Sequence, residues 1–569
     1  MRILVLLLLS GAVGVPAMAG PQANVLTQAN SAQRTGANLQ ETILTTSNVR
    51  TNFGLLWKLY SDAKIMAQPL YVSGLKSAKC PNGCNTVIFC SMKGTVYAYM
   101  ADQKPQTVND TLVWARYLGD PRAGGKDIDM WSVDDPWWGI LGTPVIDPAT
   151  SSLYVVAWNK DNSHNLYNLD LATGNVKAGP VVIEGGAGGK SLDNVHRKQR
   201  PGLLLDGGML YVAFGGDVNT KTEKGQPAGW IFVYDVKDFS LQAIWTPTPD
   251  GTNAGIWQSG RGPATDGDGF VYVVIGDGDF NASKQNYGDS IVKLKLEKAP
   301  AGSALPQQLA VEDFFTPCNQ AFLQGGDWDF GSGGPLLFDG KIAAGGKWGW
   351  LYTMSRNQLG KFTAPASAGA SACTDAASVT AFQATIGHIH GSPVYWKGPN
   401  GAFVYVWGES DHLHAFPVVG GVPTKQNAKA SAYAIPEGGS ASCPTTNPHW
   451  MPGGILSVSA NGSKAGTGIV WALVTATGDA NECRGVKGML MAFDAQNVSH
   501  ELWRSQQANP ALDTADSFGL VARFAAPTIA NGKVFVGTAG DSEPLRWYGT
   551  TSSPTQFPQS YYLAVYGLK

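Results

Sequence analysis

Short hydrophobic stretches with alternating polar positions recur along the whole chain. Each repeat begins with a small residue followed by proline, enters an alternating apolar segment, turns at Gly or Asp, and reaches a second segment of the type "VYV". "GTPVIDPATSSLYVVAW", "RGPATDGDGFVYVVIGDG" and "AAPTIANGKVFVGTAG" are three examples. A period of two bounded by turn residues is typical of β-strands. The pattern therefore predicts an all-β chain of eight units, each of roughly fifty residues or more.

The repeat predicts how the sheets are arranged. One four-stranded sheet cannot bury both of its faces, whereas radial stacking of such sheets around an axis can. We therefore predict one eight-bladed β-propeller over residues 51–569. The strand in "FGLLWKLYSD" is expected to complete the last blade beside "YYLAVYGLK", which closes the ring. Two stacked β-sandwich domains are the alternative; no Pro/Ser-rich linker divides the chain, and this favours one ring.

Composition and charge agree with this fold class and narrow the partners. The 569 residues include 70 glycines and 33 prolines, and only 15% are charged, which suits short strands joined by tight turns. The net charge of −2 argues against nucleic acid, or an anionic membrane surface, as the main partner.

The N-terminus, "MRILVLLLLSGAVGVPAMAG", has one arginine, a short apolar run and a small-x-small site that ends at Ala19. This pattern predicts a secretory signal over residues 1–19, followed by an N-terminal extension over residues 20–50. The apolar run is too short to span a bilayer, and no later segment is long enough. We expect a mature protein without a transmembrane segment, in the periplasm or outside the cell.

Seven cysteines are present, so at least one is free or paired between chains. Cys80 and Cys84 ("CPNGC") could close a small loop, and Cys443 with Cys483 could join neighbouring loops. The sequence has no C-x-x-C-H segment, which excludes a covalent c-type haem, and no Cys/His cluster has the spacing of zinc ligands.

The side chains that precede the inner strands indicate a ligand site. In a propeller the inner strand of each blade begins near the axis, so the residues just before each small-Pro start are predicted to ring the channel. They are polar, charged or aromatic, whereas a purely structural channel more often carries small apolar residues. The predicted ring contains Gln68, Trp138, Arg200, Trp257, Gln258, Arg261, Asp329, His388, His390, His449 and Arg523.

Four segments, in chain order, resemble the propellers of pyrroloquinoline quinone (PQQ) dehydrogenases. "GIWQSG" resembles the segment whose Trp forms the floor under the planar cofactor, and "YVVIGDGDFN" resembles the stretch whose Asn binds Ca²⁺. "GGDWDF" resembles the segment whose Asp is the catalytic base. "GKWGWLYTMSR" resembles the strand whose cation contacts the quinone oxygens. The resemblance implies PQQ and Ca²⁺ as cofactors, with Trp257 as the floor, Asp277 as a metal ligand, Asp329 as the base and Lys347 as the quinone contact.

Two further residues are assigned through the same resemblance. Arg261 is a second cation for the acidic cofactor. A further Ca²⁺ ligand is expected in "GGDVNTKTE", where Asp217 is the better candidate and Glu223 the worse. The residue types suit this chemistry: a flat quinone stacks on an aromatic ring, Ca²⁺ takes six to eight oxygens, and a carboxylate can take the hydroxyl proton of an alcohol.

The chain also departs from the family. Only Cys90 stands where the family's alcohol dehydrogenases often have two adjacent cysteines, Trp348 replaces the Asn after the cation, and the metal-binding Glu of the third unit is not clearly present. Many secreted propellers share the repeat without a quinone, including scaffold proteins of outer-membrane assembly. The repeat alone therefore does not imply the cofactor.

The resulting hypothesis is a secreted oxidoreductase that acts on alcohol or sugar hydroxyls. Electrons would leave to a separate carrier, because the chain has no haem motif. His388, His390, His449 and Trp138 are expected at the substrate side of the channel mouth. A transition-metal pair is conceivable for His388 and His390, which share one face of a strand, but hydrogen bonding in the channel is the commoner role.

Three alternatives stay open. The chain could be a non-catalytic propeller that binds a glycan or a protein at the channel mouth, through the loop Trp131–Trp138. It could be a glycan lyase or hydrolase that places His388, His449 and Arg261 around an acidic sugar. The loop "DGDFNASKQNYGDS" could also hold a structural Ca²⁺ at the rim without any quinone, through Asp277, Asp279, Asn281 and Asp289.

Overall fold

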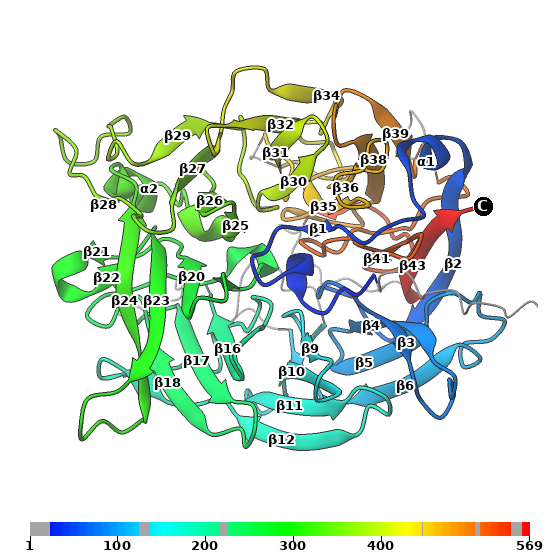
Figure 1. The fold of residues 1–569 in the computed structure, drawn as a ribbon, viewed down its shortest axis with the longest axis horizontal. Coiled ribbons are helices and arrows are strands. Elements are labelled where there is room, and N and C mark those ends of the chain that lie inside the picture. Colours follow the sequence, from blue (N-terminus) through cyan, green and yellow to red (C-terminus); the bar gives the residue numbers. More distant parts are fainter. Residues whose placement is uncertain (1–22, 125–135, 217–225, 446–447, 507–512, 548–559) are drawn as a thin grey trace, which may run out of the picture.

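The protein folds as an eight-bladed β-propeller (Figure 1), as the repeat predicted. The computed structural model describes residues 23–124, 136–216, 226–445, 448–506, 513–547 and 560–569. Within these ranges, eight sheets each contain a core of four antiparallel strands. None of the helices in the described ranges has the length and apolar character needed to cross a membrane.

The first four blades follow one another along the chain, each from its inner to its outer strand. Short hairpins are inserted between or within them, formed by β7 (Arg122–Ala123) with β8 (Trp137–Trp138), β13 (Gly186–Ala187) with β14 (Lys190–Ser191), and β21 (Phe280–Asn281) with β22 (Asn286–Tyr287). The blade strands are β3 (Leu70–Leu75), β4 (Cys84–Cys90), β5 (Thr95–Met100) and β6 (Leu112–Tyr117); β9 (Val145–Asp147), β10 (Ser152–Trp158), β11 (His164–Asp170) and β12 (Val176–Val182); β15 (Leu204–Asp206), β16 (Met209–Phe214), β17 (Trp230–Asp235) and β18 (Leu241–Trp245); β19 (Ala264–Thr265), β20 (Phe270–Val274), β23 (Ile291–Lys298) and β24 (Gln307–Thr316).

The last four blades repeat this order. Edge strands extend two of the eight blades: β28 (Lys361–Phe362) joins the fourth and β34 (Lys429–Ala434) joins the sixth. Outside the blades, β37 (Cys483–Arg484) pairs with β42 (Arg546–Trp547). The blade strands are β25 (Leu336–Phe338), β26 (Lys341–Gly345), β27 (Trp350–Ser355) and β29 (Thr380–Gln383); β30 (Val394–Gly398), β31 (Gly401–Trp407), β32 (His412–Val419) and β33 (Val422–Pro423); β35 (Ile455–Ser459), β36 (Ile469–Thr475), β38 (Gly488–Asp494) and β39 (Glu501–Arg504); β40 (Thr528–Ala530), β41 (Lys533–Gly537) and β43 (Tyr561–Leu568) with β2 (Phe53–Ser61).

The ring closes between the two ends of the chain, as predicted. Strand β2 pairs antiparallel with β43, with Leu59 opposite Leu563, so the eighth blade takes its outer strand from the N-terminal part of the chain. Helix α1 (Thr46–Asn52) leads into β2, and its start is fixed by a capping box between Thr45 and Asn48. Backbone hydrogen bonds, instead of a linker, therefore hold the first and last blades together.

The core lies between neighbouring blades. Every blade packs against another on each face, so second strands such as β36 are buried at every position. One cluster, for example, combines Tyr211 and Ile231 of the third blade with Val273 and Val292 of the fourth. Burial on both faces explains why these strands read as continuous apolar runs in the sequence.

Residues 25–38 cross the propeller channel and bind its inner strands; we call them the channel segment. Figure 1 shows β1 (Ala37–Asn38), which pairs parallel with β35, near the centre of the ring. Backbone hydrogen bonds attach the segment to six blades, and the side chains of Arg34 and Asn38 reach the carbonyls of Leu203 and Ile529 in the two others. The backbone pairs are Tyr71 with Val25, Ile146 with Leu26, Thr265 with Ala32, Leu337 with Gln33, Tyr395 with Thr35, and Val458 with Gly36.

Arg34 is the charged centre of the channel segment and is completely buried. Its guanidinium donates to the carbonyl oxygens of Pro263 (2.9 Å), Gln28 (2.8 Å) and Leu203 (3.1 Å) and to the hydroxyl of Thr27 (2.8 Å). All four acceptors are neutral. Burial, and then the charge of Arg261, lower the pKa of Arg34 to about 9. The segment is therefore an integral part of the propeller.

Three disulfides and one buried thiol account for the seven cysteines. Both predicted pairings are confirmed, and the third disulfide was not predicted. The free thiol is that of Cys90, whose pKa is raised by burial. The disulfides are Cys80–Cys84, Cys443–Cys483 and Cys318–Cys373.

Candidate active site

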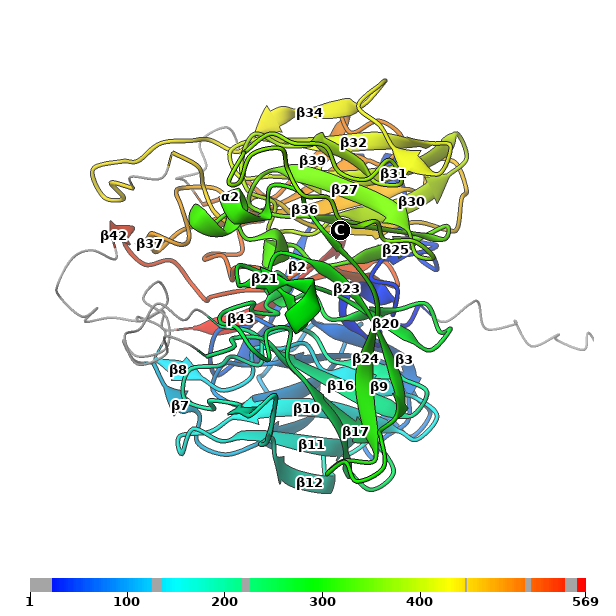
Figure 2. The ribbon, with the colours of Figure 1, turned by 90° about the vertical axis from the view of Figure 1, so that its left-hand side faces the viewer.

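Loops that lead into the inner strands of blades four, five and six bring several of the predicted residues together. The Trp257 ring lies 5.7 Å from the His390 ring, and the Lys347 amine lies 5.9 Å from the centre of the Trp257 ring. In Figure 2, α2 (Gln320–Gly325) and β21 of this region lie on the left of the ring, and the dark-blue N-terminal segment lies to the right. The channel segment and this site therefore occupy different ends of the channel.

Three carboxylates form an acidic cluster at the site. Oxygens of Asp277, Asp327 and Asp329 lie within 4.8 Å of one another. The Lys347 amine pairs with Asp327 at 2.9 Å and with Asp329 at 2.8 Å. The second oxygen of Asp329 accepts the backbone N–H of Asp277 at 2.7 Å. The three carboxylates thus outnumber the one lysine amine that pairs with members of the cluster.

Glycines allow the two acidic loops to approach. A Cβ on Gly276 would lie 2.4 Å from the Asp329 carboxylate, and a Cβ on Gly331 would lie 2.3 Å from the backbone of Gly276. Asp327 itself has a left-handed backbone, with φ of 55°. The glycines of "GGDWDFGSGG" therefore let the backbone of this segment lie close to the backbone at Gly276, and the Asp329 carboxylate thereby reaches the Asp277 loop of blade four.

A fourth carboxylate increases the crowding. Asp289 is completely buried and accepts hydrogen bonds from the Phe330 backbone (3.0 Å) and the Gln320 amide (3.3 Å). Burial, and then the charge of Asp329, raise the pKa of both Asp277 and Asp289. Within the described part of the chain, Oδ1 of Asp277 is buried without a hydrogen-bond partner. Since Ca²⁺ binds carboxylate oxygens, this oxygen-only donor set fits such a cation.

A second cluster consists of His388, His390 and Glu409. Nδ1 of His388 lies 3.3 Å from one Glu409 oxygen, and Nε2 of His390 lies 3.1 Å from the other. His390 and Glu409 are buried, whereas the His388 side chain is 22% exposed. Burial lowers the pKa of both imidazoles, that of His388 to about 3, and raises the pKa of Glu409.

Aromatic rings and arginines surround the two clusters. The His390 ring lies 5.7 Å from Phe524, over which the Arg200 guanidinium lies at 4.1 Å. Trp328 packs edge-on against His388, with ring centres 5.5 Å apart. The surroundings therefore combine apolar walls with fixed positive charge, which suits a flat, acidic ligand.

The other predicted residues are distributed differently. Arg261 is buried and donates from Nη1 to the carbonyl oxygen of Arg34, so its side chain reaches the channel segment. Burial lowers its pKa to about 9. Trp138 is also buried; it packs edge-on against Trp158, with the Lys198 amine 4.8 Å from its ring centre. His449 is half-buried and close enough to His388 to lower the pKa of that imidazole further.

Two predictions lie outside the described residues, and one site residue was missed. Asp217 and Glu223, like the signal sequence, fall in ranges that the structure does not describe. Glu409 was not singled out from the sequence, whereas Asp289 was expected only in a loop for a structural Ca²⁺. Glu409 follows Gly408 directly after strand β31, and Asp277 follows Gly276 shortly after strand β20. This recurrent glycine–acid step was the available signal.

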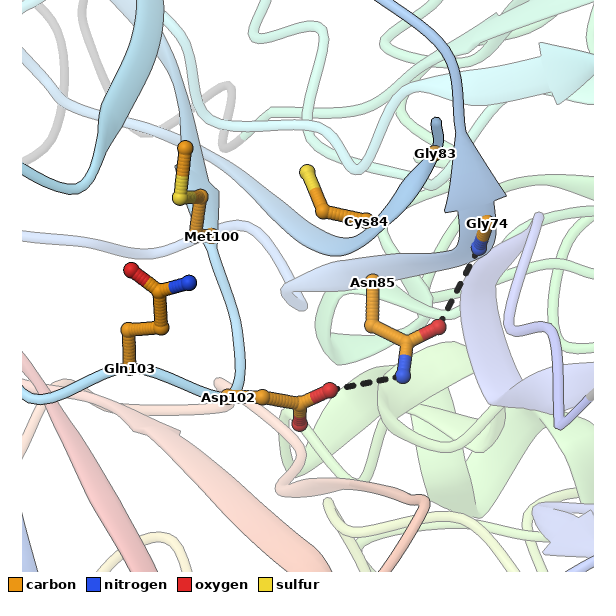
Figure 3. A pocket seen from close by; sticks show the side chains of 7 residues that line it. All are labelled: Gly74, Gly83, Cys84, Asn85, Met100, Asp102 and Gln103. Atoms are coloured by element: carbon orange, nitrogen blue, oxygen red, sulfur yellow. Dashed lines mark hydrogen bonds between the residues drawn. The ribbon is translucent and has the colours of Figure 1, made fainter. Parts of the chain in front are cut away.

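A surface pocket in blade one, shown in Figure 3, is separate from the site. The Asn85 amide lies in it, accepting from the backbone N–H of Gly74 at 3.1 Å and donating to Asp102 at 2.7 Å. The polar groups of Gly74, Asn85 and Asp102 in this pocket thus form hydrogen bonds with one another. The lining residues are Gly74, Gly83, Cys84, Asn85, Met100, Asp102 and Gln103.

Comparisons with known proteins identify the fold. No protein-family model matches the chain, and no curated protein matches its sequence. Among solved structures, it is similar to the europium-containing methanol dehydrogenase, with a TM-score of 0.53, 14% identity, and coverage of 96% of this chain and 98% of that chain.

It is also similar to two quinohemoprotein alcohol dehydrogenases. The enzyme from Pseudomonas putida HK5 has a TM-score of 0.53 at 13% identity, and the enzyme from Comamonas testosteroni has 0.51 at 15%. Each match covers 96% of this chain and 80% of the other. At such identities the likeness shows a shared propeller fold.

Proposed function

We propose that this chain is a secreted quinoprotein-like oxidoreductase that oxidises alcohol or sugar hydroxyls, with PQQ and Ca²⁺ in the axial site. The observation that carries this proposal is the acidic cluster, in which the buried Oδ1 of Asp277 has no donor among the described residues, beside Lys347 and Trp257. A likeness of fold to alcohol and methanol dehydrogenases supports it.

The acidic cluster is proposed as the Ca²⁺ site. Asp277 and Asp327 supply carboxylate oxygens, and Asp217 is proposed as a further ligand. A buried carboxylate without a donor is unfavourable, so a divalent cation would stabilise a group of acids that Lys347 neutralises only in part. Ca²⁺ accepts many oxygen ligands in irregular geometry, which suits acids from separate loops.

Trp257 and Lys347 are proposed to hold the PQQ ring. Trp257 offers an aromatic face, and Lys347 offers a cation toward the quinone oxygens. Burial by itself lowers the pKa of Lys347, but Asp329 and Asp327 outweigh it and raise that pKa, so the amine stays charged. When bound, PQQ supplies the electron-accepting quinone. Arg261, also proposed for the cofactor, would act only indirectly, because its Nη1 donates to the carbonyl oxygen of Arg34 in the channel segment.

Asp329 is proposed as the base that takes the hydroxyl proton. The Lys347 amine and the Asp277 N–H orient its two oxygens, and its side chain is 12% exposed. The two oxygens are thereby held in fixed positions, as a group that receives a proton from a bound alcohol requires. His388 and His449 line the same mouth and are proposed to contact the substrate, and Trp138 is proposed to support that wall from behind.

The proposed location is the periplasm or the exterior of the cell, with electrons passed to a separate acceptor. The predicted signal sequence and three disulfides support an oxidising compartment. A glycan lyase or hydrolase would need His388, His449 and Arg261 around one sugar. Because Arg261 binds the Arg34 carbonyl, the geometry does not favour that alternative.

Cofactor titration tests the proposal. The purified mature protein is titrated with PQQ while tryptophan fluorescence is followed, with Ca²⁺ and then with chelator. We expect saturable quenching that needs Ca²⁺ and weakens at least tenfold in Asp277→Ala. Asp268→Asn is the matched control, because Asp268 is an exposed acid in a turn of the same blade. Absence of quenching at micromolar PQQ would overturn the proposal and favour a non-catalytic binding propeller.

A further inference from the structure

The His388–His390–Glu409 cluster has a feature that a hydrogen-bonded channel wall does not explain. Within the described residues, Nε2 of His390 and both Glu409 oxygens are buried without a hydrogen-bond partner, although nitrogen and oxygen are only 3.1 Å apart. Buried polar atoms at this separation normally align as donor and acceptor. Three polar atoms therefore lie close together in this cluster without a hydrogen bond among the described residues.

The tautomer of His390 can be inferred from its other nitrogen. Nδ1 lies 3.5 Å from the hydroxyl of Ser259, and that hydroxyl donates its proton to the carbonyl of Ser332 at 2.6 Å. The Ser259 oxygen is therefore available only as an acceptor, so Nδ1 carries the proton and Nε2 presents a lone pair. A lone pair on nitrogen then faces the carboxylate, and this pair of acceptors needs a proton or a cation between them.

The donor set identifies the cation. We infer that His388, His390 and Glu409 bind one divalent transition-metal ion of the zinc class, through Nδ1, Nε2 and a carboxylate oxygen. The three ligand atoms lie within 4.8 Å of one another. Two imidazoles with one carboxylate suit such ions and leave a position open, whereas Ca²⁺ prefers oxygen alone. Ser259 orients His390 as the outer partner of a metal-binding imidazole does.

The surroundings support a resident ion. The tautomer inferred for His390 is a neutral imidazole, which is the form that metals bind. His388, which is partly exposed, provides an entry path. Trp257 and Phe524 pack against His390 with ring centres 5.7 Å away, so the ion would brace the wall that the proposed cofactor shares. The two metal positions would differ in ligand chemistry and flank Lys347.

Metal titration of the chelator-treated full chain tests this inference. Zn²⁺ binding is followed by calorimetry, and Co²⁺ by its visible absorption, in the presence of excess Ca²⁺. We expect one Zn²⁺ per chain, an affinity at least about 100-fold weaker in Glu409→Gln and His388→Ala, and no change in His500→Gln, which alters an exposed histidine. His388→Ala keeps the test decisive if the buried Glu409→Gln variant does not fold.

Asp277→Asn separates this inference from the proposed function. It should weaken Ca²⁺ and PQQ binding and leave Zn²⁺ binding intact. Failure to bind one Zn²⁺ at micromolar concentration, equal binding by Glu409→Gln and His388→Ala, or full displacement of Zn²⁺ by Ca²⁺ would each overturn the second metal site. The quinoprotein proposal would survive any of those results.

Discussion

The two ends of the channel are both buried and polar, yet they differ in how donors and acceptors are matched. At one end, four N–H groups of Arg34 meet four neutral oxygens. At the other end, Asp277 lies beside Asp327 and Asp329, and the lone pair of His390 faces Glu409. Burial and polarity alone therefore do not mark a ligand site. Acceptors that face acceptors do, because a proton or a cation must lie between them.

The comparison predicts that the two ends respond differently to substitution. Groups at the matched end should control stability, and groups at the mismatched end should control binding and activity at little expense in stability. Four measurements test this contrast.

The largest effect is expected from Asp329→Asn. Removing the proposed proton acceptor should lower dye-linked oxidation of alcohols or sugars by about 10²–10⁴-fold. The free energy of unfolding should change by less than about 1 kcal/mol, because the amide keeps the acceptor for the Asp277 N–H. Steady-state rates and urea denaturation of the same sample check this. A variant that retains its full rate would exclude Asp329 as the base.

Arg34→Ala should have the next largest effect, on stability. It removes four buried hydrogen bonds from the channel segment, and we expect about 3 kcal/mol of destabilisation in urea after the favourable loss of a buried charge is included. The control is Arg50→Ala on the exposed face of α1, expected to change stability by less than about 0.5 kcal/mol. Equal stabilities for the two variants would mean that the channel segment is not integral to the fold.

Asp277→Asn should stabilise the metal-free protein. The pKa of Asp277 is raised in the folded state, by burial and by neighbouring carboxylates, so this residue destabilises the fold at every pH above its unfolded pKa. Replacing it should add about 1–2 kcal/mol at pH 7 and weaken Ca²⁺ at least tenfold. Chelator-treated samples in urea give the first value. Destabilisation of the metal-free form would contradict the crowding described here.

The smallest effect concerns His164, which begins strand β11 of blade two. It is completely buried, its Nδ1 contacts Asn194 at 2.9 Å, and burial lowers its pKa to about 3. In the unfolded chain the His164 imidazole takes up a proton near pH 6.5, whereas in the folded chain it does not. The free energy of unfolding therefore falls as the pH drops from about 6.5 toward 3. We expect a loss of about 1 kcal/mol between pH 7.5 and 5.5. His164→Gln should lack it, and an unchanged pH slope in that variant would assign the loss elsewhere.

Much of the fold follows from the sequence because propeller strands repeat. The small-Pro start and the alternating segments located eight inner strands, and the N-terminal strand β2 closed the ring as expected. The channel segment was not foreseen. It has almost no strand of its own, and its position depends on single hydrogen bonds to strands far away in the sequence.

The site was predicted in part, for a similar reason. Trp257, Asp329 and His390 precede inner strands, Lys347 follows the second strand of blade five, and the structure brings the four together. Glu409 carries no recognisable motif, and its role appears only through burial and contacts. The sequence also did not predict the direction of every side chain. Arg261 precedes an inner strand, yet its guanidinium reaches the channel segment.

Calorimetric titration of the chelator-treated protein with Ca²⁺, in the absence of PQQ, shows whether the acidic end of the channel binds a cation. We expect one saturable Ca²⁺ site that is lost in Asp277→Asn and retained in Glu409→Gln and Asp268→Asn. A protein that takes up no Ca²⁺, or that binds it equally well without the Asp277 carboxylate, would contradict the claim that facing acceptors at this end of the channel mark a cation site.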